Sequence, residues 1–135
     1  MKLQDSPRED IQGIDDIKIF VNSFYGVIQN DSLLGPIFNA VIQDRWDAHL
    51  AIMYTFWQTI LFDQHTYSGR PFPPHAKLPI EKAHFDHWLS LFRATIDRLY
   101  VGPIAEEAKS RAEKMALLFQ IKLDHIRNNP FKPIL

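Results

Sequence analysis

The stretch Ser68–Pro79, SGRPFPPHAKLP, decides how this chain is divided. It contains four of the nine prolines in the sequence and separates long segments whose apolar residues recur at helical spacing. Proline lacks a backbone N–H and fixes φ, so a run of this kind cannot continue a helix. Long structureless segments inside a compact domain are usually functional. His75, which stands in the middle of this stretch, is therefore a candidate functional residue.

On both sides of this stretch, apolar residues recur in steps of three and four, which predicts amphipathic helices. We expect long helices over about 14–28, 44–62, 81–99 and 103–126. The Gly-Pro pair at 35–36 belongs to a turn that could carry a short helical segment after the first of them. No alternating strand pattern competes with this reading. The sequence therefore predicts an all-α fold with four principal helices.

The length and composition indicate one domain with an aromatic core. The chain has 135 residues, of which 46% are hydrophobic and 13% aromatic. A chain of this length can bury a core of its own, so we expect a single domain over 1–135 with a flexible tail at 1–9. The net charge of −1, without basic runs, gives no sign of nucleic-acid binding. The absence of cysteine excludes disulfides and thiolate metal sites.

Nothing in the sequence indicates a membrane segment. The N-terminal stretch MKLQDSPRED lacks the apolar core of a signal peptide. The longest apolar run, near 50–62, contains Gln58 and is too short to cross a bilayer. We therefore expect a cytoplasmic protein without membrane insertion.

Histidines are the candidates for metal or acid–base chemistry. His49 falls on the apolar stripe of the second long helix, where it could be a core residue bonded to backbone or a residue facing a site. His75 could be an ordinary loop histidine or a side chain aimed by the rigid prolines before it. His84 and His87 have the i, i+3 spacing of a helical metal pair but no obvious further ligand. The pattern predicts surface positions for His87 and His125.

The order of the motifs adds a second line of inference. The run FYGVI…LLGPIF…WDAHLAIMYTFW…PFPPHAKLP…HFDHWLSLF resembles the third group of truncated haemoglobins over roughly residues 14–127. Its specific features are a Phe-Tyr pair, Gly-Pro-x-Phe, Trp-x-x-His followed by Phe-Trp, a lone histidine after prolines, and Trp-Leu-x-Leu-Phe. The resemblance implies a globin-like two-over-two helical sandwich around haem b. It also implies a short proximal helix within the proline-rich loop.

The resemblance implies a role for each matched residue. His75 matches the proximal ligand of the haem iron, and His49 matches the histidine over the distal face. Tyr25 and Trp88 match the polar aromatics of the distal pocket, where an O–H and an N–H can donate to a ligand. The matched pocket-wall positions are Phe24, Phe38, Met53, Phe56 and Trp57. By their proximity to the two matched histidines, the candidates for contacts with the haem propionates are Arg45, Arg70 and Lys77.

The activity implied is the binding of O2, NO, CO or a similar small ligand by haem. Donors around such a ligand hold O2, and they also stabilise the charge that develops as an O–O bond breaks. We therefore expect O2/NO or peroxide-linked redox chemistry, like that of an NO dioxygenase or a peroxidase and with a reductase partner, rather than simple transport. The alternatives are a ligand sensor or storage protein and, in another class, a cofactor-free helical scaffold whose aromatics only form a core.

Overall fold

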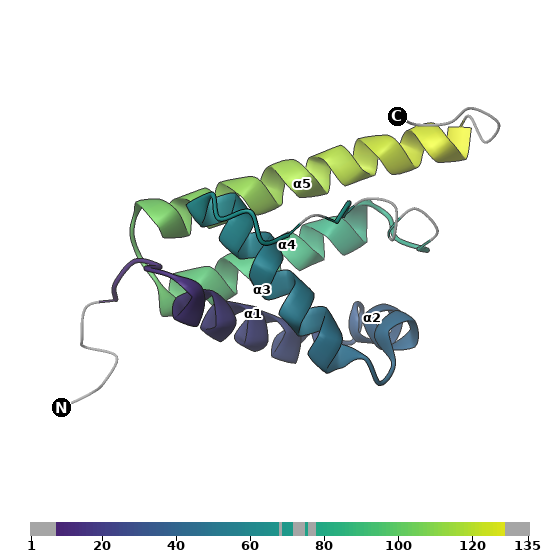
Figure 1. The fold of residues 1–135 in the computed structure, drawn as a ribbon. Coiled ribbons are helices and arrows are strands. Elements are labelled where there is room, and N and C mark those ends of the chain that lie inside the picture. The colour runs from purple at the N-terminus through teal and green to yellow at the C-terminus, as the bar shows by residue number, and fades with distance from the viewer. Residues whose placement is uncertain (1–7, 68, 72–74, 76–77, 129–135) are drawn as a thin grey trace.

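The computed structural model describes residues 8–67, 69–71, 75 and 78–128. Within these residues it is built from helices without strands: α1 (Ile14–Gln29), α2 (Gly35–Ile42), α3 (Trp46–Phe62), α4 (Lys82–Leu99) and α5 (Pro103–Asn128) (Figure 1). The predicted all-α class and its four long helices are confirmed. The turn at 35–36 begins a short helix of its own, α2. None of the helices described combines the length and apolarity needed to cross a bilayer.

The long helices form two pairs. Helix α1 packs against α3, helix α4 packs against α5, and a contact between α1 and α4 joins the pairs. In Figure 1, α5 runs along the top of the molecule with α4 below it, while α3 crosses obliquely toward α2. This is the two-over-two arrangement that the resemblance implies. The chain passes from α3 to α4 through the segment 63–81, which carries His75.

An aromatic cluster holds α1, α3 and α4 together. Phe20 of α1 and Phe92 of α4 are fully buried, and Trp57 of α3 stacks on Phe92 with ring centroids 5.2 Å apart. Phe20 meets Trp57 and Phe92 edge-on at 5.7 and 6.0 Å. Aromatic pairs in such geometries contribute about 0.5–1.5 kcal/mol each beyond the burial of their surface. The cluster therefore fixes the positions of the three helices from which the site is built.

A second apolar cluster ties α5 to α4 and to the end of the segment 63–81. Its buried members are Ile80, Phe85, Ala116, Phe119 and Leu123. Ile80 precedes α4, whereas Phe119 lies in the middle of α5. Because both belong to one cluster, the return from the proline-rich stretch into α4 is anchored on α5.

The turn between α1 and α2 depends on close backbone packing. A Cβ atom on Gly35 would lie 2.9 Å from the carbonyl oxygen of Gln29, closer than side chains tolerate, so only glycine fits where α2 meets the end of α1. The Asp31 carboxylate accepts hydrogen bonds from the amides of Leu33 (3.0 Å) and Leu34 (2.9 Å). Both residue types that predicted this turn therefore have a role in it: Gly35 allows the close approach of the backbones, and Asp31 accepts hydrogen bonds from the amides of the turn.

The start of α5 is capped by a residue from the other end of the chain. The Asp10 carboxylate accepts hydrogen bonds from the amides of Ile104 and Ala105, both at 2.8 Å. Glu9 also accepts, through its carbonyl oxygen, a hydrogen bond from the Val101 amide at 3.0 Å. Residue 9, at the end of the expected tail, is thus attached to the fold, and residues 1–7 lie outside the described part of the chain.

Candidate functional site

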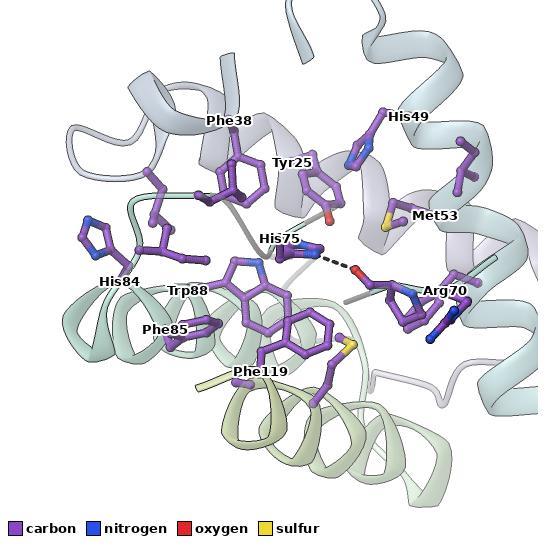
Figure 2. A pocket seen from close by; sticks show the side chains of 18 of the residues that line it. Tyr25, Phe38, His49, Met53, Arg70, His75, His84, Phe85, Trp88 and Phe119 are labelled. Atoms are coloured by element: carbon purple, nitrogen blue, oxygen red, sulfur yellow. Dashed lines mark hydrogen bonds between the residues drawn. The ribbon is translucent and has the colours of Figure 1, made fainter. Parts of the chain in front are cut away.

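An apolar cavity of about 260 Å³ lies between α3, α4, α5 and the segment 63–81 (Figure 2). Tyr25 of α1 and Phe38 of α2 close one side of it. Ile52 and Arg70 line the cavity and are exposed, so they mark the edge where it opens to solvent. A concave and mainly apolar site with few polar groups is typical of cofactor and small-molecule binding. The other lining residues are Leu34, His49, Met53, Phe56, Tyr67, Pro71, His75, Leu78, Ile80, His84, Phe85, Trp88, Met115, Ala116 and Phe119.

The ring of His75 is oriented by contacts on two sides. Its Nδ1 atom lies 2.6 Å from the carbonyl oxygen of Pro71, a contact drawn as a dashed line in Figure 2. Because a carbonyl can only accept, Nδ1 carries the proton and Nε2 keeps its lone pair. The Leu78 amide donates to the His75 carbonyl at 3.1 Å and closes a turn. The ring of Phe119 packs against the imidazole with centroids 4.9 Å apart.

The protonation state of His75 suits a metal ligand. Burial lowers the pKa of its imidazole, and the hydrogen bond to Pro71 opposes this only in part. A neutral ring whose Nδ1–H is held by a carbonyl presents Nε2 in the form that binds a metal. Pro71 thus contributes a carbonyl oxygen, whereas Pro73 and Pro74, to which we assigned the stiffness of the loop, lie outside the described residues.

His49 faces the cavity from α3 and lies close to Tyr25 and Trp46. Its ring meets those of Tyr25 and Trp46 edge-on, with centroids 5.1 and 5.7 Å apart. Its Nε2 atom is buried, and no described residue gives it a hydrogen bond. Burial and the nearness of His75 both lower the pKa of His49. A buried polar atom without a partner is costly, which indicates that this side of the cavity is built to meet a further group.

Tyr25 brings a hydroxyl into the cavity. The side chain is buried, and Figure 2 shows its oxygen pointing into the cavity on the side of His75. Among the residues that the structure describes, none hydrogen-bonds this hydroxyl. Burial raises the pKa of Tyr25, so the hydroxyl keeps its proton and remains a donor.

Trp88 is held by two rings and presents its edge to the same space. Its indole stacks on Phe92 of the next turn, with centroids 5.6 Å apart and planes within 7°, and meets Phe24 edge-on at 5.4 Å. Trp88 lines the cavity, and Figure 2 shows its indole nitrogen on the side of His75. The fixed ring therefore aims an N–H donor at the region that Tyr25 also faces.

The five pocket-wall residues implied by the resemblance divide into two groups. Phe38, Met53 and Phe56 line the cavity. Phe24 and Trp57 are buried but do not line it. These two residues lie one layer behind the residues that line the cavity.

Phe24 and Trp57 form a layer behind the cavity wall. Phe24 meets Tyr25 edge-on at 5.0 Å, and Trp57 meets Phe56 edge-on at 5.4 Å. Each is the sequence neighbour of a residue that does face the cavity. Successive side chains on a helix point about 100° apart, and at these two positions the neighbour faces the cavity while Phe24 and Trp57 point into the buried core. Phe24 and Trp57 instead support the residues beside them.

The predicted cationic residues lie in different places. Arg70 lines the open edge of the cavity. Arg45 is not among the lining residues, because its guanidinium donates to the carbonyl oxygens of Val41 (2.7 Å) and Ile42 (3.3 Å) at the end of α2. Lys77 lies outside the described residues. Of the three candidates for propionate contacts, Arg70 is thus the one that the structure places at the cavity.

The possible metal pair of His84 and His87 is not formed. His84 accepts a hydrogen bond from the Glu81 amide through Nδ1 (3.0 Å) and caps α4. His87 is partly exposed at the surface, where its Nε2 lies 2.7 Å from an oxygen of Asp31. Within the described ranges, no group of three or more histidine or carboxylate side chains could hold a metal ion alone. His125 is exposed.

Several lining residues carry no signal that singles them out in the sequence. Met115 and Phe119 belong to the predicted apolar stripe of the last helix, which indicated only that they face inward. Tyr67 and Leu78 come from the irregular segment, where no periodicity assigns a direction to a side chain. Their place at the cavity depends on contacts with other elements: Tyr67 meets Phe56 of α3 edge-on at 5.3 Å, and Leu78 packs against the cluster that contains Phe119 of α5.

Four long helices in two pairs, with the short α2 beside α1 and an apolar cavity that contains one oriented imidazole, are the arrangement of a globin. A family model described as "Bacterial-like globin" matches residues 8–122. A group 3 truncated hemoglobin of Campylobacter jejuni is 33% identical over 101 residues, which are 72% of this chain and 80% of the relative. The crystal structure of group III truncated hemoglobin from Campylobacter jejuni superimposes with a TM-score of 0.80 at 29% identity, covering 87% of this chain and 95% of that one.

This chain belongs to the third group of truncated haemoglobins, within the bacterial-like globins. Membership of the globin family implies that it binds haem and small gaseous ligands. The residues present fit a haem. The cavity wall is apolar, His75 offers an unprotonated Nε2, and the buried Nε2 of His49 lacks a partner among the described residues.

Proposed function

We propose that this protein binds haem b through His75 and uses the polar aromatics of its cavity for redox chemistry, either the reaction of O2 with NO or a reaction of peroxide. The observation that carries this proposal is the pairing, in one apolar cavity, of a free imidazole nitrogen with donors that have no partner among the described residues. When bound, haem would supply the metal centre at which a diatomic ligand coordinates and exchanges electrons. The macrocycle would be held mainly by burial of its apolar surface.

On the proximal side, the chain would hold His75 in one orientation. The Pro71 carbonyl keeps the Nδ1 proton in place, which makes Nε2 the more basic and the available nitrogen. The Phe119 ring supports the imidazole from α5. Phe119 belongs to a buried cluster of α5, so on that side the imidazole would need little rearrangement to bind a metal.

On the distal side, Tyr25 and Trp88 would donate hydrogen bonds to the ligand. The Tyr25 ring packs against Phe24 and the Trp88 ring against Phe92, so the donors are oriented before a ligand arrives. Donors fixed in an apolar cavity stabilise charge more strongly than donors in water do. A ligand that becomes partly negative, such as O2, would therefore be held longer than one that stays nearly neutral, such as CO.

Slow release of O2 favours a protein that uses bound O2 in a reaction over one that transports O2. Combining one O2 with one NO gives nitrate only when one electron is supplied, so this use of the site requires a reductase as partner. The same donors would stabilise the charge that develops when the O–O bond of a peroxide breaks. A sensor or storage protein would share the binding step but would have no need of an electron donor.

The reaction of the oxygenated protein with NO tests the proposal. The protein, loaded with haem b, reduced and exposed to O2, is mixed with NO in a stopped-flow instrument, and the products are assayed. We expect an intense absorption band near the blue edge of the visible range and about one nitrate per haem. Simple replacement of O2 by NO without nitrate would favour the sensor, and absence of the band would favour a cofactor-free scaffold.

His49 is expected to control ligand entry more than ligand retention. Its ring lies between those of Tyr25 and Trp46 on the wall of the cavity. Removing the imidazole through His49→Leu should change the association rates of O2 and CO about tenfold, equivalent to 1.4 kcal/mol in the barrier, with a smaller effect on dissociation. Flash photolysis gives both rates. A larger effect on O2 release than on entry would show that His49 mainly bonds the ligand.

A further inference from the structure

Arg127, near the end of α5, is bonded to the segment that carries His75. Its Nη2 atom donates hydrogen bonds to the carbonyl oxygens of Ile80 (2.8 Å) and Leu78 (3.3 Å). These carbonyls lie on either side of Pro79, which has no N–H of its own. Pro79 therefore offers no backbone donor at this point. The side chain of Arg127, from α5, donates the hydrogen bonds that the two carbonyl oxygens accept.

The residue held by Arg127 also closes the turn of His75. The Leu78 carbonyl accepts from Arg127, while the Leu78 amide donates to the His75 carbonyl at 3.1 Å. A short chain of hydrogen bonds thus runs from α5 to the backbone of His75. Ile80, the second partner of Arg127, is buried in the apolar cluster that also contains Phe119.

Helix α5 therefore supports His75 at two levels. Phe119 packs against the imidazole itself, with ring centroids 4.9 Å apart. About two helical turns further along, Arg127 holds the backbone that follows His75. The first contact limits rotation of the ring, and the second limits movement of the turn that carries it.

We propose that Arg127 is a positioning residue for His75, which keeps the Nε2 atom of the imidazole at a constant place in the cavity. This inference rests on the proposed binding of haem through His75. The Arg127 side chain suits the task because the guanidinium is always charged and offers several N–H donors in one plane. Hydrogen bonds from a charged donor are stronger than those between neutral groups.

A merely structural role for Arg127 makes a different prediction. A positive charge in the last turn of a helix interacts favourably with the partial negative charge of the helix end. Lysine would serve that role as well as arginine does. Lysine would not reproduce a planar donor that bonds two carbonyl oxygens, so Arg127→Lys separates the two roles.

The experiment compares Arg127→Met, Arg127→Lys and the matched control Arg111→Lys in the haem-loaded protein. Arg111 lies on the same helix, and its Nε bonds Glu107, one turn away, at 2.6 Å. The measurements are the transfer of ferric haem to excess apoglobin, the iron–histidine stretching band of the ferrous protein, and the melting temperature of each apoprotein. The first two report on the iron–His75 bond, and the third reports on the fold.

Arg127→Met should lose haem about tenfold faster, equivalent to 1.4 kcal/mol, and should shift or broaden the iron–histidine band. Arg127→Lys should show the same change of the band with an apoprotein melting temperature close to that of the wild type. Arg111→Lys should match the wild type in all three measurements. Because Arg127→Lys keeps the charge at the end of α5, it tests the contact even if Arg127→Met does not fold.

Two results would overturn the inference. One is a wild-type band in both Arg127 variants, even if haem loss is faster, since the arginine would then stabilise α5 alone. The other is an equal change in Arg111→Lys. Failure of the proposed function would look different: the wild type would take up no haem, or His75→Gly would leave the ferrous spectrum unchanged.

Discussion

Replacing His75 with glycine should abolish stable haem binding, or leave haem that is retained only when imidazole is added. The mutation removes the Nε2 atom that the Pro71 carbonyl and the Phe119 ring hold in the cavity. Loss of a partner that only orients a metal ligand costs about 10–100-fold in affinity, so loss of the ligand itself should cost more than about a hundredfold. Haem titration and transfer to apoglobin measure the change, and added imidazole should restore the spectrum by occupying the vacated position.

His65→Gly is the matched control for this prediction. His65 lies in the same segment between α3 and α4, but its side chain is exposed and lies 3.3 Å from an oxygen of Asp63. This variant should bind haem like the wild type. A normal five-coordinate ferrous spectrum in His75→Gly would disprove the role of His75, and it would direct attention to His49 or His84, which also line the cavity.

Tyr25→Phe and Trp88→Phe should each release O2 about tenfold faster than the wild type, equivalent to 1.4 kcal/mol for one hydrogen bond. Both substitutions keep most of the ring that packs in the cluster and remove the group that donates. The Tyr25 hydroxyl keeps its proton because burial raises its pKa, and the Trp88 indole is fixed by stacking on Phe92. Stopped-flow displacement of O2 by CO measures the dissociation rate. Release of CO, which is less polar when bound, should change less.

Tyr54→Phe provides the control for loss of a hydroxyl. Tyr54 lies on α3, but its hydroxyl donates to Asn22 at 2.5 Å and the residue does not line the cavity. Its O2 release should equal that of the wild type. If Tyr25→Phe and Trp88→Phe also release O2 at the wild-type rate, the donors do not act on the ligand. The protein would then be better described as a haem carrier or an electron-transfer module.

The sequence was sufficient to predict the helices because their signals are local. Apolar spacing located α1, α3, α4 and α5 to within a few residues, and Pro103 begins α5 as its fixed φ and missing N–H favour. The place of His75 in an irregular segment also followed from local chemistry, since prolines cannot continue a helix. Assigning roles to Tyr25, His49 and Trp88 required the family resemblance, because periodicity indicates that a side chain faces inward but not what it meets there.

Contacts between distant segments could not be predicted in this way. No feature of the sequence near Asp31 indicates that the Nε2 atom of His87 will lie 2.7 Å from its carboxylate oxygen. Burial raises the pKa of Asp31, but the hydrogen bonds from His87 and from the amides of Leu34 and Leu33 outweigh it and lower that pKa. Asp10 likewise caps α5 from 94 residues away.

By itself, the sequence determined where helices begin and end, which faces are apolar, and that one histidine stands in a proline-rich segment. These properties depend on residues within a few positions of one another. Only the tertiary structure decided that Phe38 lines the cavity while Phe24 lies behind it, and that Arg127 reaches the segment of His75. The physical reason is that packing against other elements sets the rotation of a helix about its axis and the partners of its side chains. Residues that are neighbours along the chain do not determine that packing.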